Sequence, residues 1–158
     1  MNPDLHAQLQ AFIEQMPFVR QFDLQINKAQ RGLIEVAMKP FPALFNHFKT
    51  YQAGACFTLA EVTGGLACGT FIDLADTFLV TKRIEISYIY PSDQALIATA
   101  EVSTGMIERT LSTLNKKNKT TLVVEVVVKD KDQNIIVRTS NEYYLRKGIP
   151  RSFTDART

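Results

Sequence analysis

Tryptophan is absent from the sequence, and cysteine and histidine occur only twice each. Protein metal sites draw most of their ligands from clustered Cys and His residues, so this scarcity predicts no metal centre. Cys56 and Cys68 lie in one apolar segment, twelve positions apart. If that segment is a helix, the two thiols are too far apart for a disulfide, and we expect them to be buried and free in a reducing compartment.

Neither sign of charge dominates, because 18 Lys and Arg residues stand against 16 Asp and Glu residues, a net charge of +2. This balance favours neither a nucleic acid nor a membrane surface as a partner. The opening stretch, MNPDLHAQLQAFIEQMP, lacks the basic leader and the apolar core of a secretory signal. We therefore expect a cytoplasmic protein.

Long apolar runs are also rare, and only residues 50–72 (TYQAGACFTLAEVTGGLACGTFI) could be considered as a membrane span. One carboxylate, one glutamine and four glycines within this stretch argue against a span and favour a buried central helix. Glycine lowers helix propensity, but the length of the stretch and its lack of alternation still predict a helix that is stabilised by burial.

Periodicity along the rest of the chain predicts short strands and two further helices in a single domain, residues 1–158. Short connections favour antiparallel pairing, so the fold class is α+β, with one sheet packed on the central helix. In the strand at 81–90 we expect Tyr88 and Tyr90 to line the sheet, and residues 148–158 are expected to be a frayed tail. The other expected helices are 4–16 and 105–119, and the expected strands are 22–27, 33–39, 81–90, 95–103, 120–130 and 134–146.

Glu61 is the single charged residue of the apolar stretch. At helical spacing it shares a face with the small residues Gly54, Thr58, Gly65 and Cys68, which would let another group approach the helix closely. The remaining directions carry large apolar residues that are expected to pack on the sheet: Phe57, Leu59, Val62, Leu66 and Phe71. Because burial disfavours an ionised carboxylate, Glu61 is either a functional group or a member of a structural ion pair.

Two features upstream of Glu61 favour a functional role. Asn46 lies in the irregular stretch before the apolar segment, and the predicted helix begins near Ala53 and Gly54. Free N–H groups at the start of a helix can stabilise a developing oxyanion. A carboxylate two turns further along could act on a carbonyl that is held at this end.

This pattern of an Asn, a small Gly-containing turn, a long helix with a central acid, and then antiparallel strands resembles the hotdog-fold acyl-CoA thioesterases. The closer similarity is to the phenylacetyl-CoA thioesterase branch, and to a related bacterial hotdog group of poorly defined function that has a small helix before the last hairpin. The resemblance covers roughly residues 20–146 and implies an antiparallel sheet wrapped around the central helix. It leaves the first helix outside.

The resemblance also implies a role for each candidate residue. Glu61 stands at the position of the general base or nucleophile, and Asn46 at that of the residue that orients the thioester or the water. Ala53 matches a position whose N–H polarises the thioester carbonyl, and Thr81 matches a hydroxyl that helps to place the water. Gln52 and Gly54 would complete the substrate-binding turn.

The same resemblance implies an acyl-CoA or related thioester as substrate, with coenzyme A as part of that substrate and no separate cofactor. In that branch the site forms between two subunits, so we expect a homodimer or a dimer of dimers.

One departure from the family pattern keeps other functions open. The family often has His-Gly-Gly where this chain has Gln52-Ala53-Gly54, and Gln cannot transfer a proton as His can. A non-catalytic hotdog module that binds acyl-CoA or acyl chains is therefore an alternative. A dehydratase or hydratase, and a structural protein with Glu61 in a buried ion pair, are two more. The sequence does not identify the acyl group.

Overall fold

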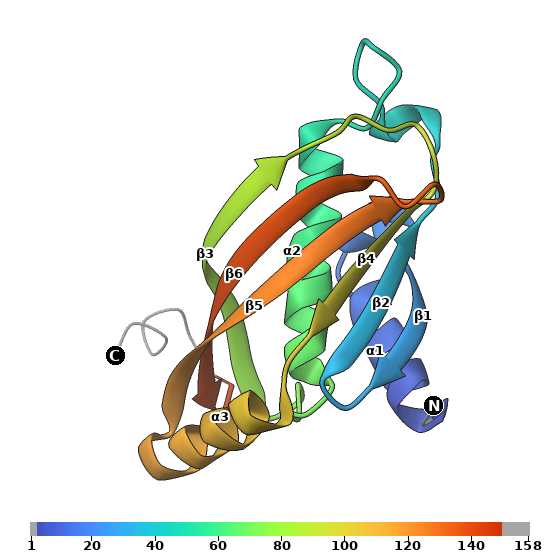
Figure 1. Ribbon diagram of the computed structural model, residues 1–158. Helices are drawn as coiled ribbons and strands as arrows, with labels where there is room; N and C mark the ends of the chain where they lie inside the picture. Colours follow the sequence, from blue (N-terminus) through green and yellow to red (C-terminus); the bar gives the residue numbers. More distant parts are fainter. Residues whose placement is uncertain (1–2, 150–158) are drawn as a thin grey trace.

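The computed structural model describes residues 3–149, and its six-stranded antiparallel sheet curves around one long helix, α2 (Figure 1). The order of strands in the sheet is β1-β2-β4-β5-β6-β3. The helices are α1 (Pro3–Glu14), α2 (Ala53–Gly69) and α3 (Thr104–Lys117), with short 3-10 turns at Val19–Phe22 and Pro42–Leu44. The strands are β1 (Gln25–Gln30), β2 (Leu33–Met38), β3 (Thr77–Tyr88), β4 (Leu96–Glu101), β5 (Lys119–Asp130) and β6 (Ile135–Lys147).

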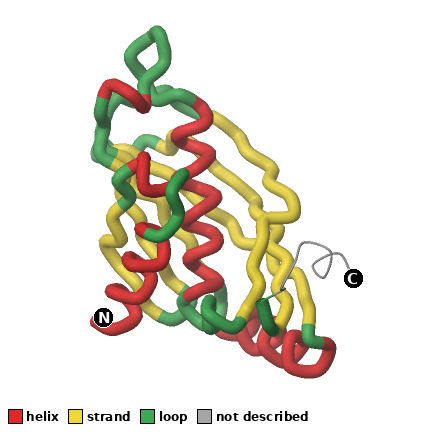
Figure 2. The backbone as a smooth tube through the Cα atoms, turned by 180° about the vertical axis from the view of Figure 1, so that it is seen from behind, coloured by secondary structure: helices red, strands yellow, loops and turns green. Residues whose placement is uncertain are grey.

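The hydrophobic core lies between the inner face of the sheet and α2. Along β5 the buried residues alternate with exposed ones, as expected for a sheet with one face in the core, and the buried set is Leu122, Val124, Val126 and Val128. Helix α1 lies beside α2 on the same side of the sheet (Figure 2). The α+β class, the central helix, the N-terminal helix and the small helix inserted before the last hairpin are all confirmed.

Three local features differ from the sequence prediction. Strand β3 runs from Thr77 to Tyr88, whereas a strand at 81–90 was expected. The first strand begins at Gln25 rather than at residue 22, because Phe22 ends a 3-10 turn and Asp23 has a left-handed backbone (φ 48°). Phe57 was expected to pack on the sheet, but its side chain is 39% exposed. Of the expected frayed tail, residues 150–158 lie outside the described part of the chain.

Strand β3 forms one edge of the sheet and contains a β-bulge. Thr81 pairs with Tyr143 and Arg83 pairs with Glu142, which leaves Lys82 as the extra residue. The bulge changes the face on which the preceding residues lie, as bulges commonly do. Thr81 therefore lies on the inner face with Ile84, although two residues separate them.

Helix α2 is almost entirely enclosed by the sheet and α1, which explains how it tolerates its glycines. Gly64 lies where β6 comes closest, so that a Cβ atom there would overlap the Tyr143 hydroxyl and lie 2.6 Å from Asn141 Nδ2. Within residues 3–149, no helix is both long and apolar enough to cross a membrane.

Candidate functional site

Glu61 lies near the middle of α2, half-buried, and its carboxylate accepts a short hydrogen bond from the Thr81 hydroxyl of β3. The structure thus brings together two of the residues proposed from the sequence, and the bulge in β3 is the reason that they meet. Glu61 forms no ion pair with any residue in the described range 3–149, where the two salt bridges are Lys82–Glu142 and Arg83–Glu85. The structural ion-pair alternative therefore has no partner in this part of the chain.

A pocket of about 270 Å³ opens beside the Glu61 carboxylate. Its walls are mainly apolar and come from α1, from the segment that follows α1, from α2 and from strands β3 and β6. The lining residues are Phe12, Met16, Glu61, Val62, Gly65, Leu66, Leu79, Val80, Thr81 and Tyr143. A carboxylate at the wall of an apolar pocket is a common arrangement for acid–base or nucleophilic chemistry.

The turn of α2 that carries Glu61 contacts two buried polar side chains of β6, Tyr143 and Asn141. The Tyr143 hydroxyl donates to the backbone oxygen of Glu61 at 2.6 Å, and it accepts from Asn141 Nδ2 at 3.1 Å. Asn141 Nδ2 also donates to the Ala60 oxygen at 3.2 Å. Tyr143 and Asn141 thus bond to two consecutive carbonyls of α2 from outside the helix.

Burial raises the pKa of Tyr143 far above its usual value, and the nearby Glu61 and Cys68 raise it further. The phenol therefore keeps its proton and its donor role at physiological pH. Sequence analysis missed Tyr143 and Asn141. The signal that could have indicated a close approach by another element was the adjacent pair of glycines at 64 and 65.

The start of α2 provides two free donors. Gln52 is the N-cap residue with an extended backbone (φ −64°, ψ 139°), and its side chain forms no capping hydrogen bond. In the described part of the chain the amides of Ala53 and Gly54 donate no hydrogen bond, as is usual in the first turn of a helix. The Tyr88 hydroxyl of β3 donates to the Ala53 oxygen at 3.1 Å.

Asn46 is half-buried close to this turn, but its side chain already has partners. Asn46 Oδ1 accepts from the amides of Phe48 (2.9 Å) and Thr50 (3.3 Å), and Nδ2 donates to the Thr50 hydroxyl (3.0 Å) and the Tyr51 oxygen (3.3 Å). These bonds shape the loop before α2. A contact between Asn46 and a substrate would require that one of them be exchanged.

A second pocket, of about 310 Å³, lies at the start of α2. It contains three of the proposed residues, Asn46, Gln52 and Ala53, and also the side chains of Tyr88 and Tyr90, which had been expected to line the sheet only. This expectation for the two tyrosines was too narrow, because the end of β3 runs past the helix start. Cys56 also lines this pocket, whereas the proposed residue Gly54 is exposed next to Ala53 and does not line it.

The proposed residues are thus divided between two pockets of one chain. Glu61 and Thr81 line the pocket in the middle of α2, whereas Ala53 lies at the helix start. Ala53 and Glu61 are eight positions apart in the helix, which corresponds to about 12 Å along the axis. Within one chain, Glu61 and the amides of Ala53 and Gly54 are therefore too far apart to contact the same carbonyl.

Both cysteines are free and buried, as expected. Burial raises the pKa of Cys56 to about 11 and that of Cys68 to about 12. A thiol with so high a pKa is a poor nucleophile at neutral pH, since the thiolate is the reactive form. Neither cysteine is a candidate catalytic residue.

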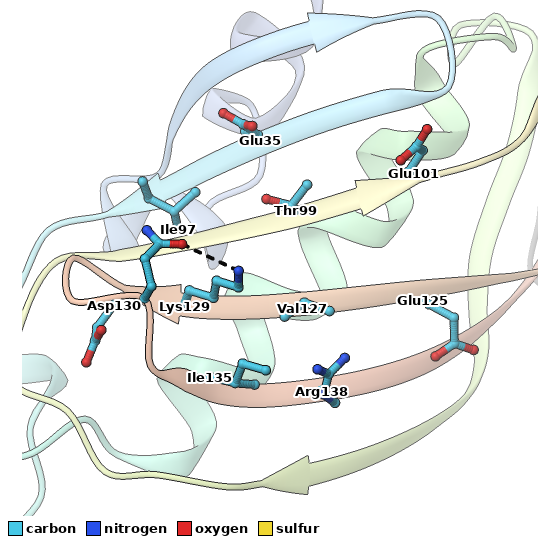
Figure 3. A pocket seen from close by; sticks show the side chains of 11 residues that line it. Glu35, Ile97, Thr99, Glu101, Glu125, Val127, Lys129, Asp130, Ile135 and Arg138 are labelled. Atoms are coloured by element: carbon cyan, nitrogen blue, oxygen red, sulfur yellow. Dashed lines mark hydrogen bonds between the residues drawn. The ribbon is translucent and has the colours of Figure 1, made fainter.

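A wide hollow of about 660 Å³ lies on the outer face of the sheet, away from α2 (Figure 3). Its charged residues have both signs and come from β2, β4, β5 and β6. Those labelled in the figure are Glu35, Glu101, Glu125, Lys129, Asp130 and Arg138. None of the proposed site residues lies there, and the mixture of charges is typical of the solvated face of an antiparallel sheet.

Comparison with known proteins supports the description of the fold. The model of a family described as a domain of unknown function, DUF4442, matches residues 6–145. No curated protein matches the chain.

Several solved structures are similar. A protein of unknown function from Pseudomonas aeruginosa, called a probable thioesterase, aligns with a TM-score of 0.79 at 22% identity, over 89% of this chain and 95% of that one. A thioesterase from Haemophilus influenzae aligns with a TM-score of 0.71 at 14% identity, over 90% and 93% of the two chains. The PaaI protein from the phenylacetic acid degradation operon of E. coli aligns with a TM-score of 0.66 at 18% identity, over 88% and 94%.

Proposed function

Because this chain belongs to the DUF4442 family and has the hotdog fold of the similar structures, we propose that it is a thioesterase that hydrolyses an acyl-CoA or a related thioester. The observation that carries the proposal is the Glu61 carboxylate, which has no cationic partner among residues 3–149, accepts a hydrogen bond from Thr81, and faces an apolar pocket. The names of the similar proteins support the same chemistry.

In this proposal the thioester carbonyl lies against the amides of Ala53 and Gly54, which stabilise the negative charge on its oxygen. Glu61 acts in one of two ways. As a general base it takes a proton from water while the water oxygen attacks the carbonyl carbon; as a nucleophile it forms an anhydride that water then hydrolyses. In either case the carbon–sulfur bond breaks, the thiolate of coenzyme A takes up a proton, and a carboxylic acid is released. Thr81 and Asn46 fix the geometry, and coenzyme A is the carrier of the substrate.

We further propose that the complete site forms between two copies of the chain. The two half-sites of one chain are about 12 Å apart along α2, too far to share one carbonyl. Strand β3 has an unpaired edge in the described chain, and large apolar side chains gather near it: Phe57, Val80, Tyr88 and Ile89 are 39–51% exposed. Pairing two such edges about a two-fold axis would place Glu61 of one copy near the helix start of the other.

A homodimer, or a dimer of dimers built from it, is therefore the expected assembly. Light scattering coupled to size-exclusion chromatography measures it directly. A chain that remains monomeric at micromolar concentration while it hydrolyses thioesters would disprove the shared site.

The decisive experiment on the function is the substitution Glu61→Gln. The amide keeps the size and the hydrogen bond from Thr81 but cannot take a proton or attack as a carboxylate. We expect kcat/KM for thiol release to fall by about 10²–10⁴-fold, with unchanged circular dichroism and oligomeric state. Wild-type turnover by this variant would end the proposal.

A second candidate function is a non-catalytic module that binds acyl-CoA or acyl chains. Two observations favour it: Gln52 and Ala53 replace the family's His and Gly, and the Asn46 side chain is occupied by bonds within its loop. Calorimetry that shows acyl-CoA binding by the wild-type protein, together with no release of thiol, would decide for this candidate.

We propose the cytoplasm as the location. Two free, buried thiols support a reducing compartment.

A further inference from the structure

We propose that helix α1 and the residue Met16 that follows it set the size and the chemical class of the acyl group, by closing the pocket beside Glu61 to all but uncharged groups of medium size. This inference rests on the proposed function and extends it to the substrate. It starts from the observation that Phe12 and Met16 line the same pocket as Glu61.

The N-terminal segment is fixed in place, so its side chains form a defined wall. Leu9 and Ile13 are buried in the core, at 3% and 2% exposure. The Gln10 side chain ties α1 to the start of β1. Its Nε2 donates to the Leu24 oxygen at 3.1 Å, and its Oε1 accepts from the Ile26 amide at 2.9 Å. Phe12 lies on this anchored helix, half-buried.

Met16 is half-buried just beyond the end of α1, and its backbone oxygen accepts from the Arg20 amide at 2.9 Å. This bond fixes the backbone, while the unbranched thioether side chain can still adjust to what it contacts. Met16 is thus suited to act as an adaptable end wall for an apolar group.

The chemistry of the pocket wall selects against charged acyl groups. Among the residues that line it, all within the described chain, there is no Lys, Arg or His, and the one charged group is the Glu61 carboxylate. An acyl group with a terminal carboxylate would be desolvated next to a like charge without a compensating cation, which is unfavourable. Aliphatic and aryl acyl groups gain from burial in the same space.

The volume of the pocket limits the length of the acyl group. About 270 Å³ holds roughly nine groups the size of a water molecule, at about 30 Å³ each. An octanoyl or a phenylacetyl group fills this space, whereas a palmitoyl group exceeds it.

Gly65 of α2 also lines the pocket, and a small side chain can be added there without a clash. A Cβ atom there would lie 3.7 Å from Leu79 Cδ2 and 3.7 Å from Tyr143 Cε1, which is ordinary contact. Gly65→Ala therefore offers a way to shorten the pocket while the fold is kept. Met16→Ala offers the opposite change.

The experiment measures thiol release from acetyl-, octanoyl-, palmitoyl-, phenylacetyl- and succinyl-CoA by the full-length wild-type protein and its variants. For the wild type we expect kcat/KM for octanoyl- and phenylacetyl-CoA to exceed that for palmitoyl- and succinyl-CoA by at least tenfold. Met16→Ala should raise the palmitoyl-to-octanoyl ratio at least fivefold, and Gly65→Ala should lower the octanoyl-to-acetyl ratio about tenfold. Gln8→Ala, a change at an exposed position of α1, should move neither ratio.

A second measurement separates failure of this inference from failure of the proposed function. Calorimetry with the Glu61→Gln variant reads the acyl preference from binding alone, so it reports on the pocket even if no thioester is hydrolysed. Hydrolysis with unchanged ratios in both Met16→Ala and Gly65→Ala would overturn this inference and leave the thioesterase proposal intact. Absence of hydrolysis by the wild type, with binding that still depends on acyl length, would overturn only the proposed catalysis. Binding that ignores acyl length would also overturn the inference.

Discussion

Replacement of Gly64 by Ala tests whether the contact between α2 and β6 is as tight as the structure indicates. The added Cβ would overlap the Tyr143 hydroxyl and lie 2.6 Å from Asn141 Nδ2 and 3.1 Å from Tyr143 Cε2. Tyr143 and Asn141 are only 1% and 0% exposed, so neither side chain can swing into solvent. The strand or the helix must shift instead.

The size of the effect can be worked out from three terms. Overpacking in a core costs about 1–3 kcal/mol. If the hydroxyl is displaced, the buried Glu61 oxygen loses this partner, at about 1–3 kcal/mol, whereas Asn141 Nδ2 keeps its bond to the Ala60 oxygen. Ala gains about 1 kcal/mol over Gly in helix propensity. The expected net loss in the free energy of unfolding is about 1–5 kcal/mol.

Urea denaturation at one fixed protein concentration measures this loss, because the stability of an oligomer depends on concentration. Gly65→Ala is the matched control, since its Cβ meets only ordinary contacts at 3.7 Å and should leave stability unchanged or raise it by up to about 1 kcal/mol. Adding Tyr143→Phe to Gly64→Ala removes the atom in the closest clash, so the double variant should lose less stability than the sum of the single changes. Equal stability of Gly64→Ala and Gly65→Ala would refute the reasoning.

The remaining predictions concern the hydroxyl beside Glu61 and the buried thiols. Thr81→Val keeps the shape of the side chain but removes the hydrogen-bond donor to Glu61. It should lower kcat for thiol release at least tenfold, with little change in the free energy of unfolding measured by urea denaturation. An unchanged kcat would show that Thr81 is not part of the site. The pKa of Cys68 is raised by burial from 9.0 to about 12, so the folded state holds its proton more tightly than the unfolded chain. Stability should therefore be complete below pH 9 and fall as the pH rises towards 12, by up to about 1.4 kcal/mol per pH unit for this thiol. Cys68→Ala should make that decline shallower in urea titrations from pH 8 to 11, and an identical slope would contradict the assignment.

Most of the fold could be predicted from local sequence patterns. The period-two alternation of Ile84, Ile86 and Tyr88, the apolar run around Glu61, and the turns between them depend on neighbouring residues, and the elements they predict are confirmed. The boundary error at the first strand has a local cause too, because a left-handed residue at Asp23 delays the strand.

What could not be predicted depends on contacts between distant segments. Strict alternation from Ile84 would place Thr81 on the outer face, and only the bulge at Lys82 turns it towards Glu61. No pattern in the sequence marks that extra residue. The support of the Glu61 turn by Tyr143 likewise joins residues that are 82 positions apart.

The bulge at Lys82 has a further consequence for the edge on which it lies. Strand β3 is an edge strand of twelve residues, and a regular edge strand of this length can form backbone hydrogen bonds with any extended peptide. Here the ladder is interrupted part of the way along, and two adjacent cations, Lys82 and Arg83, occupy the interruption. An extended peptide without a matching irregularity cannot follow this contour for its full length, and a peptide that places cations opposite these two is repelled. The residue that turns a hydroxyl towards the carboxylate would thus also protect the free edge from unspecific aggregation.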